Sequence, residues 1–413
     1  MSLVPTTITA RRTPGHKPAL AWFAAFGGAW VFVLVLLGAF TTSIGAGMIF
    51  PDWPLSNGSL NPDGWLSDLA KFAEHSHRLS AEVMSLVAIG LAVWIWFTEE
   101  RAWLRRLAIF AVVLVLVQAV VGGLRVLLEP EQVVTISTSV GQLFAMLHAC
   151  LAQIFVCTLL AIAVSLSRAW TAPVPEAGRR VEWESPASRV LQGAPATQTG
   201  AGLRRLGRVC CGLLLVQLAV AAVMRHSFAG LAIPTFPLST PDGALLPTAW
   251  DFRVAIQFAH RVMAALLAVA LPWFAIALWR ERVRGSGQKN GALLLVALLA
   301  LQIFLGAEAV WRLRDPYWTT AHVLAGACLL ATTFGLTWWT HRGVIESRAG
   351  AARRVGEPFA SPRAGLAPDL GQKQTPTSNG ALGTRPSREA STFAKVTADR
   401  PAGTATRPTC DHS

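Results

Sequence analysis

The stretch that decides the fold covers residues 107–128 and reads LAIFAVVLVLVQAVVGGLRVLL, with Arg125 as its only charged residue. A helix of about 20 mostly apolar residues is long enough to cross the hydrocarbon core of a bilayer. Eight runs of this kind occur in the chain, at residues 20–41, 78–97, 107–128, 140–166, 206–224, 254–279, 292–312 and 318–340. The sequence therefore predicts an all-α integral membrane protein with eight transmembrane helices.

The overall composition agrees with a lipid environment. Of the 413 residues, 53% are hydrophobic and only 14% are charged, whereas soluble domains carry roughly a quarter charged residues. The 16 tryptophans also fit, because indole rings favour the lipid–water interface. The net charge of +13 comes from loops and tails between the apolar runs. The expected partner is therefore the lipid bilayer with its anionic headgroups, and not nucleic acid.

Basic residues mark every second loop and give the chain an orientation. The positive-inside rule places both termini in the cytoplasm of a bacterial cell, with a multi-pass chain in the inner membrane. We expect a cytoplasmic N-terminal segment, an N-terminal four-helix half, a cytoplasmic linker, a C-terminal four-helix half and a disordered tail, at residues 1–18, 19–166, 167–205, 206–343 and 344–413. The tail has few large apolar residues, so it cannot bury enough surface to order itself.

The two halves carry matching motifs. Residues 42–55 read TSIGAGMIFPDWPL and residues 226–238 read HSFAGLAIPTFPL, each a small-residue turn followed by Pro-x-aromatic-Pro-Leu. Three further motifs recur in the same order: EHSHR at 74–78 as QFAHR at 257–261, QAVVGG at 118–123 as QIFLGA at 302–307, and LH at 147–148 as AH at 321–322. The repeat predicts two tandem four-helix bundles, parallel because four crossings return the chain to its starting side.

Four histidines obey this duplication, one on the second and one on the fourth helix of each half: His77, His148, His260 and His322. Two imidazoles from facing helices can ligate one haem iron axially, so the sequence predicts two haem sites toward the outer face. A hydrogen bond between helices is the alternative for any single histidine, and two ligands per half are too few for zinc. His75 and His226 have no counterpart in the repeat and are expected in loops.

Two arginines directly follow the histidines of the second helices. The guanidinium groups of Arg78 and Arg261 suit the carboxylate geometry of a haem propionate. In the alternative interpretation each arginine only anchors its helix by reaching toward water.

The repeat breaks at one informative position, where Glu74 in the first half corresponds to Gln257 in the second. Residues three apart share a helix face, so Glu74 is expected to face whatever His77 binds. A carboxylate in a partly dry site suits proton transfer or the stabilisation of a developing cation, and an amide does neither. The N-terminal half is therefore expected to hold the reactive site and the C-terminal half a supporting cofactor. An ion pair between Glu74 and Arg78 is the structural alternative.

Taken together, the motifs resemble the haem A synthase family, membrane enzymes of cytochrome oxidase assembly. The resemblance covers residues 20–340 and rests on both Pro-x-aromatic-Pro-Leu loops, on the motif from Glu74 to Arg78, and on His148, His260-Arg261 and His322. It implies oxidation of the C8 methyl group of haem O to the formyl group of haem A, through hydroxylation and loss of water. The sequence leaves open whether the enzyme that makes haem O, oxidase assembly factors or further copies of the chain are partners.

The same resemblance assigns roles to the histidine pairs. It implies that His77 and His148 ligate the iron of the substrate haem, with Glu74 as the catalytic carboxylate. It implies a haem b cofactor in the C-terminal half, whose iron is ligated by His260 and His322.

The chain departs from the family in its outer loops. Many bacterial members carry a cysteine pair in the first loop, where this chain has Phe50 and Ser56, so a thiol-linked route for electrons or substrate is not expected here. Residue 228 is Phe where the family often has Gly, and the second loop is expected to be shaped differently.

Two other functions stay open at this point. The first is a di-haem b electron-transfer protein, and the second is a haem transporter or chaperone. The mismatch between Glu74 and Gln257 favours the enzyme, because an electron carrier needs no carboxylate beside only one iron. All four histidines also lie toward one face, whereas electron carriers usually place their haems at two depths. A transporter would need polar residues along a midplane path, and the odd-numbered helices have few.

Overall fold

The structure is a computed structural model that describes residues 15–133, 138–172, 200–281 and 286–348. Within these ranges eight helices are long and apolar enough to cross a membrane. They are α1 (Pro18–Ser43), α2 (Leu69–Thr98), α3 (Ala102–Leu127), α4 (Val140–Leu166), α7 (Ala201–His226), α8 (Phe252–Arg280), α9 (Ser286–Trp311) and α10 (Pro316–Thr340). The prediction of an all-α protein with eight spanning helices is confirmed.

Several element boundaries differ from the expected ones. Helix α2 begins at Leu69, because the Asp68 side chain caps it by accepting from the amides of Ala70 and Lys71, both at 2.9 Å. His77 therefore lies two turns inside α2 and not at its start.

The structure also contains short elements outside the eight long helices. A one-turn helix, α5 (Arg168–Thr171), and the first turn of α7 fall inside the expected linker. The strands β1 (Gln132–Val133) and β2 (Thr138–Ser139) pair antiparallel between α3 and α4. Residues 342–348 are helical, and the rest of the expected tail lies outside the described residues.

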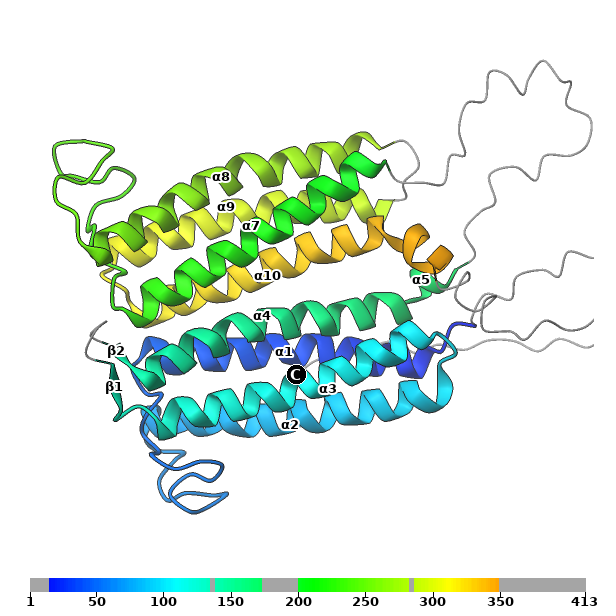
Figure 1. The fold of residues 1–413 in the computed structure, drawn as a ribbon, viewed down its shortest axis with the longest axis horizontal. Helices are drawn as coiled ribbons and strands as arrows, with labels where there is room; N and C mark the ends of the chain where they lie inside the picture. The colour runs from blue at the N-terminus through cyan, green and yellow to red at the C-terminus, as the bar shows by residue number, and fades with distance from the viewer. Residues whose placement is uncertain (1–14, 134–137, 173–199, 282–285, 349–413) are drawn as a thin grey trace, which may run out of the picture. The chain divides into compact units, whose positions relative to one another are not determined.

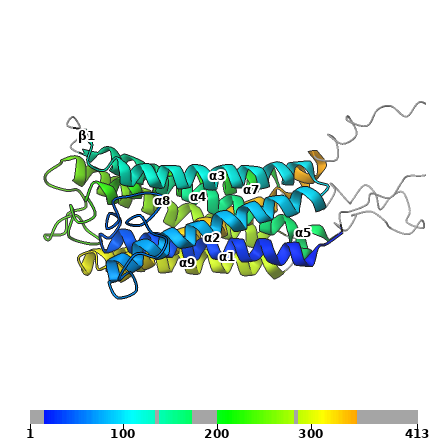
Figure 2. The same ribbon diagram turned by 90° about the horizontal axis from the view of Figure 1, so that it is seen from below.

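The long helices contact one another in two rings. Helices α1, α2, α3 and α4 contact in sequence and close through α1 with α4, and α7 to α10 do the same. Across the rings, α4 and α10 lie side by side, and α10 also contacts α1 while α4 contacts α7 (Figure 1). Helices α1, α2 and α3 can be followed along their length in Figure 2.

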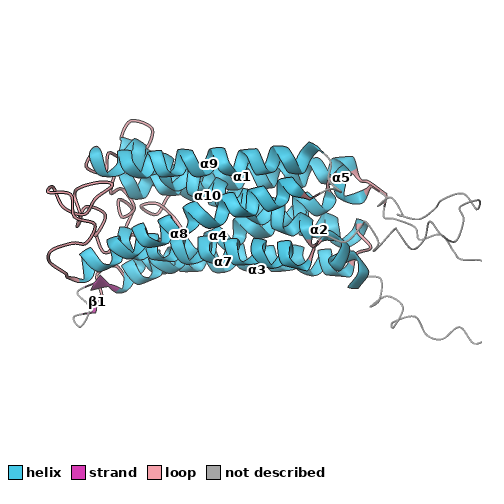
Figure 3. Ribbon diagram, turned by 90° about the horizontal axis from the view of Figure 1, so that it is seen from above, coloured by secondary structure: helices cyan, strands magenta, loops and turns pink. Residues whose placement is uncertain are grey.

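The two long loops that follow α1 and α7 lie at the same end of the helices (Figures 1 and 3). Each ring has its own apolar core. Met84, Leu91 and Ile162 are fully buried in the first, and Leu271 and Phe274 in the second. Burying apolar side chains between helices holds each ring in a fixed arrangement, so the residues at the loop end of the helices keep defined neighbours.

Cysteine labelling tests the predicted orientation. Asn57→Cys and Asp242→Cys, both exposed in the long loops, should react with a membrane-impermeant maleimide in intact cells. Gly287→Cys, near the start of α9, should react only after permeabilisation, and the parent chain measures labelling of the native cysteines. Labelling of Gly287→Cys but not Asn57→Cys in intact cells would reverse the orientation.

Candidate functional site

The two outer loops begin with the same backbone geometry. Gly45 and Phe228 occupy equivalent positions just beyond α1 and α7, with φ of +72° and +56°. One residue on, the amide of Ala46 donates to the carbonyl of Thr41, and that of Ala229 to the carbonyl of Met224, both at 2.9 Å. Phe228 therefore leaves the first turn of the second loop unchanged, although the loops differ further on, where Ser56 pairs with Ser59 and Ser239 donates to the Ala244 carbonyl. The tight turn needs the left-handed region, and Phe228 adopts it with its side chain exposed.

Glu74 anchors the first loop to α2. Its buried carboxylate accepts from the amides of Ile49 at 2.7 Å and Phe50 at 3.1 Å. Its other oxygen pairs with Arg78 Nη2 at 2.6 Å. The expected alternative, an ion pair one turn along the helix, is therefore present. Glu74 contributes to the loop structure whatever further role it has.

Arg78, also on α2, binds carbonyl groups of the same loop. Its two terminal nitrogens donate to the carbonyls of Phe50, Asp52 and Leu55 at 2.6–2.9 Å, as well as to Glu74. All four hydrogens on these nitrogens are thus directed at protein acceptors.

Gln257 and Arg261 repeat this arrangement in the second half. Gln257 accepts from the amide of Ile233 at 2.5 Å and donates to the carbonyl of Gly230 at 2.9 Å. Arg261 donates to the carbonyls of Ile233 at 3.0 Å and Thr235 at 2.6 Å. The two anchors differ in one respect. Gln257 accepts and donates with its amide, and the first loop uses a carboxylate paired with an arginine.

The paired histidines lie against small residues of neighbouring helices. A Cβ added at Gly38 of α1 would come within 2.7 Å of the His77 ring, and one added at Gly122 of α3 within 3.1 Å of the His148 ring. Gly306 of α9 has the same relation to His322, at 3.0 Å.

Helix positions bring each pair of histidines together. Helices α2 and α4 are opposite members of the first ring, and α8 and α10 are opposite members of the second. His148 lies within electrostatic range of His77, and His322 lies within range of His260. Each predicted pair is therefore carried by opposite helices of one ring, and its role as a pair of haem ligands stays a prediction.

Three of the paired histidines have a buried ring nitrogen without a protein partner. The Nδ1 atoms of His77, His260 and His322 are buried and have no hydrogen-bond partner in the part of the chain that the structure describes. Buried polar atoms without a partner are rare and call for an explanation. Histidine side chains that the protein leaves partly without partners could hold a haem. His148 differs because its Nδ1 lies 3.2 Å from the carbonyl oxygen of Gln118.

No role was assigned from sequence to the glutamines that lie next to the histidines in the structure. Gln302 Nε2 lies 3.3 Å from His322 Nε2, and Gln217 Nε2 lies 3.3 Å from His260 Nε2. Gln118 and Gln302 are the first residues of two matching motifs, and this match could have indicated that they contact the histidines. Gln217 has Leu34 at the equivalent place on α1, so the repeat gave no signal for it.

The expectation that His75 and His226 lie in loops is wrong. His75 lies inside α2, buried, with Nδ1 at 3.1 Å from Ser56 Oγ and its ring 6.0 Å from that of Phe50. Phe50 and Ser56, where the resemblance led us to expect a cysteine pair in other members, both contact this histidine. His226 is the last residue of α7.

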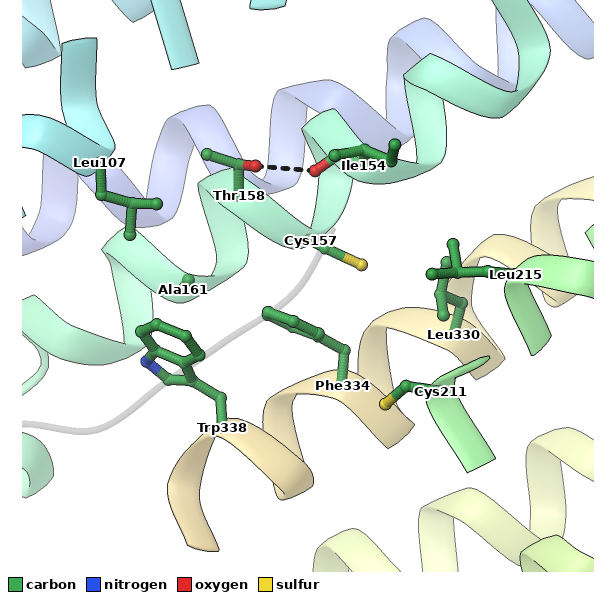
Figure 4. Close-up of a pocket in the computed structure, with 10 residues that line it drawn as sticks. All are labelled: Leu107, Ile154, Cys157, Thr158, Ala161, Cys211, Leu215, Leu330, Phe334 and Trp338. Atoms are coloured by element: carbon green, nitrogen blue, oxygen red, sulfur yellow. Dashed lines mark hydrogen bonds between the residues drawn. The ribbon is translucent and has the colours of Figure 1, made fainter. Parts of the chain in front are cut away.

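An apolar cavity lies apart from these sites. It has a volume of about 200 Å³ between α4, α7 and α10 (Figure 4). Cys157 and Cys211 line it, and the Thr158 hydroxyl donates to the Ile154 carbonyl at 2.8 Å, so that hydroxyl is already satisfied. None of the paired histidines lines this cavity, which is therefore separate from the candidate haem sites.

Comparison with known protein families bears directly on these sites. A family model described as cytochrome oxidase assembly protein, COX15-CtaA, matches residues 20–334. The chain belongs to this family. The match runs from α1 into α10 and so includes both histidine pairs and both outer loops.

Curated relatives extend over both halves. The haem A synthase of Bacillus pumilus is 25% identical over 311 residues, covering 73% of this chain and 88% of the relative. That of Rhodopseudomonas palustris strain HaA2 is 27% identical over 363 residues, covering 77% and 89%. That of Nitrosomonas eutropha is 26% identical over 372 residues, covering 80% and 95%.

Two substitutions at Glu74 test the loop anchor. Glu74→Ala should lower the free energy of unfolding by about 3 kcal/mol, because it removes a buried ion pair and two amide contacts. Glu74→Gln should cost only about 1 kcal/mol, because Gln257 performs the same task in the second half. Thermal unfolding in detergent and protease cleavage within residues 49–60 provide the measurements. Equal losses would show that the ion pair with Arg78 carries the anchor alone.

Proposed function

We propose that this chain is a haem A synthase that oxidises the C8 methyl group of haem O to a formyl group. The observation that carries the proposal is the unequal repeat. Both halves have a histidine pair and an anchored loop, but only the first has a carboxylate, Glu74, one turn from its α2 histidine. The relatives that cover both halves are haem A synthases.

His77 and His148 are the proposed axial ligands of the substrate haem. Both rings pack against glycines, which leave room for little besides the imidazole on those sides. Glu74 follows the same helix face as His77 and is held in place by Arg78 and the loop amides. Its carboxylate can accept the proton released as the methyl carbon is oxidised, or stabilise positive charge that develops there.

His260 and His322 are the proposed ligands of a haem b cofactor. The group supplies a one-electron redox centre when bound. Gln217 and Gln302, on the neighbouring helices, lie 3.3 Å from the Nε2 atoms of the two rings. A haem iron bound through these nitrogens would replace the two glutamine contacts.

The arrangement in the membrane follows from the same proposal. We take the two helix rings as tandem, parallel four-helix bundles with both termini in the cytoplasm. The loop end of the helices then faces outward and carries both haem sites. The enzyme that makes haem O remains a candidate partner, because haem O is too apolar to leave the bilayer readily.

One observation favours a second function, a di-haem electron carrier. Glu74 and Gln257 both anchor an outer loop, so a carboxylate at residue 74 has a structural use even without chemistry. The two functions predict different results when the wild-type chain is compared with a conservative variant at this position, because only a synthase forms haem A that the variant can lose.

Glu74→Gln separates chemistry from structure. It keeps an acceptor for the loop amides but removes the carboxylate, so the protein should retain haem while haem A formation falls below about 1% of wild type. The matched control is Gln257→Glu, which should leave haem A formation intact. Extracted haems from membranes of a strain lacking its own enzyme are quantified by chromatography. Normal haem A in Glu74→Gln cells would remove the catalytic role of Glu74, whereas no haem A from the wild-type chain in this strain would favour the electron carrier.

A further inference from the structure

The arginines next to the histidines are already engaged by the protein. Arg78 and Arg261 direct their terminal nitrogens at loop carbonyls, as described above. A haem propionate would have to compete with these bonds. The propionate contacts expected of these two residues remain a prediction, and other cations in the sites have fewer partners.

Arg125 is one such cation in the first half. It follows Gly122 by three residues on α3, so it lies on the face that contacts His148, one turn nearer the outer end. A Cβ at Gly47 of the first loop would meet its guanidinium. In the described part of the chain this guanidinium makes no hydrogen bond and no ion pair. Glu74 and Glu129 are the carboxylates within electrostatic range.

In the second half, Arg314 lies next to the outer loop, although it does not match Arg125 in the repeat. The residue that corresponds to Arg125 on α9 is Ala309, which has no charge. Arg314 lies in the turn after α9 with φ of +65°, and a Cβ at Gly230 would come within 3.3 Å of its side chain. Gly230 is the counterpart of Gly47. Arg125 and Arg314 come from positions that the repeat does not match. Each nevertheless lies against the equivalent glycine of its outer loop.

Arg225 lies between these two cations. Its Nη2 donates to the carbonyl of Ala39 at 2.9 Å and to Ser43 Oγ at 2.8 Å, both on α1 of the other half. It lies within electrostatic range of Arg125 and Arg314. None of the three arginines has a carboxylate within ion-pair distance among the described residues. Three like charges held in partly buried positions need anions to offset their repulsion.

We propose that Arg125 and Arg314 bind the propionate carboxylates of the haems in the first and second halves, with Arg225 between them. The identity of the ligands as haems rests on the proposed function. Guanidinium and carboxylate form paired, charge-assisted hydrogen bonds. Each haem is then held by two histidines through its iron and by an arginine through its propionates.

Arg314→Gln and Arg125→Gln test the proposal in the purified full-length protein. Transfer of haem b to an excess of an apoglobin acceptor should be at least about tenfold faster from Arg314→Gln. Its midpoint potential should fall, because a cation no longer offsets the propionate charge, and Arg314→Lys should restore the potential. Arg125→Gln should lose the farnesylated haem and keep haem b. Arg312→Gln, two residues away and paired with Glu308, is the matched control and should behave as wild type.

The outcomes distinguish this proposal from the function on which it rests. Faster haem b transfer without any haem A formation in the wild type would support the arginines and overturn the synthase. Wild-type retention and potential in both arginine variants would overturn the arginine assignment. So would selective haem loss from Arg78→Gln and Arg261→Gln with unaltered thermal unfolding, since it would return the propionates to those residues.

Discussion

The sites depend on how each outer loop is tied to the helix that carries a histidine. Irregular backbone at the membrane surface needs partners for its amides and carbonyls, and neither helix nor strand supplies them here. Glu74 with Arg78, and Gln257 with Arg261, supply them from positions beside His77 and His260. Loop position and histidine position are therefore set by the same turn of helix. A loop held in this way is fixed to its helix by hydrogen bonds.

This shared anchoring role gives a structural reason for a polar residue at both positions of the mismatch between Glu74 and Gln257. If the residue three positions before each α2 or α8 histidine served only to bind a loop, an amide would be sufficient in both halves, as Gln257 shows. The first half instead keeps a carboxylate and pairs it with Arg78. The structural role explains why residue 74 is polar and buried. The choice of an acid over an amide is the part that the proposed chemistry explains.

Much of the fold was predictable because lipid imposes strong constraints on sequence. Eight apolar runs predicted the eight long helices, and the repeat predicted the pairing of His77 with His148 and of His260 with His322. The errors arose where local context outweighed pattern. Capping by Asp68 extended α2, so His75 became a buried helical residue.

Other features had no signal in the sequence. Phe228 adopts a left-handed conformation that residue type disfavours, because the turn after α7 requires it. Arg125 and Arg314 are not related by the repeat, so only the fold shows that they approach Gly47 and Gly230.

The central claim is that the two histidine pairs hold two chemically different haems. The most direct measurement is mass spectrometry of the haems extracted from the purified protein, produced in cells that also make haem O. The account predicts haem b together with haem O, haem A or a hydroxylated form between them. Substitution of His260 should remove haem b selectively, since His260 belongs to the second pair. Haem b alone, at two equivalents for each chain, would contradict the account and identify an electron carrier.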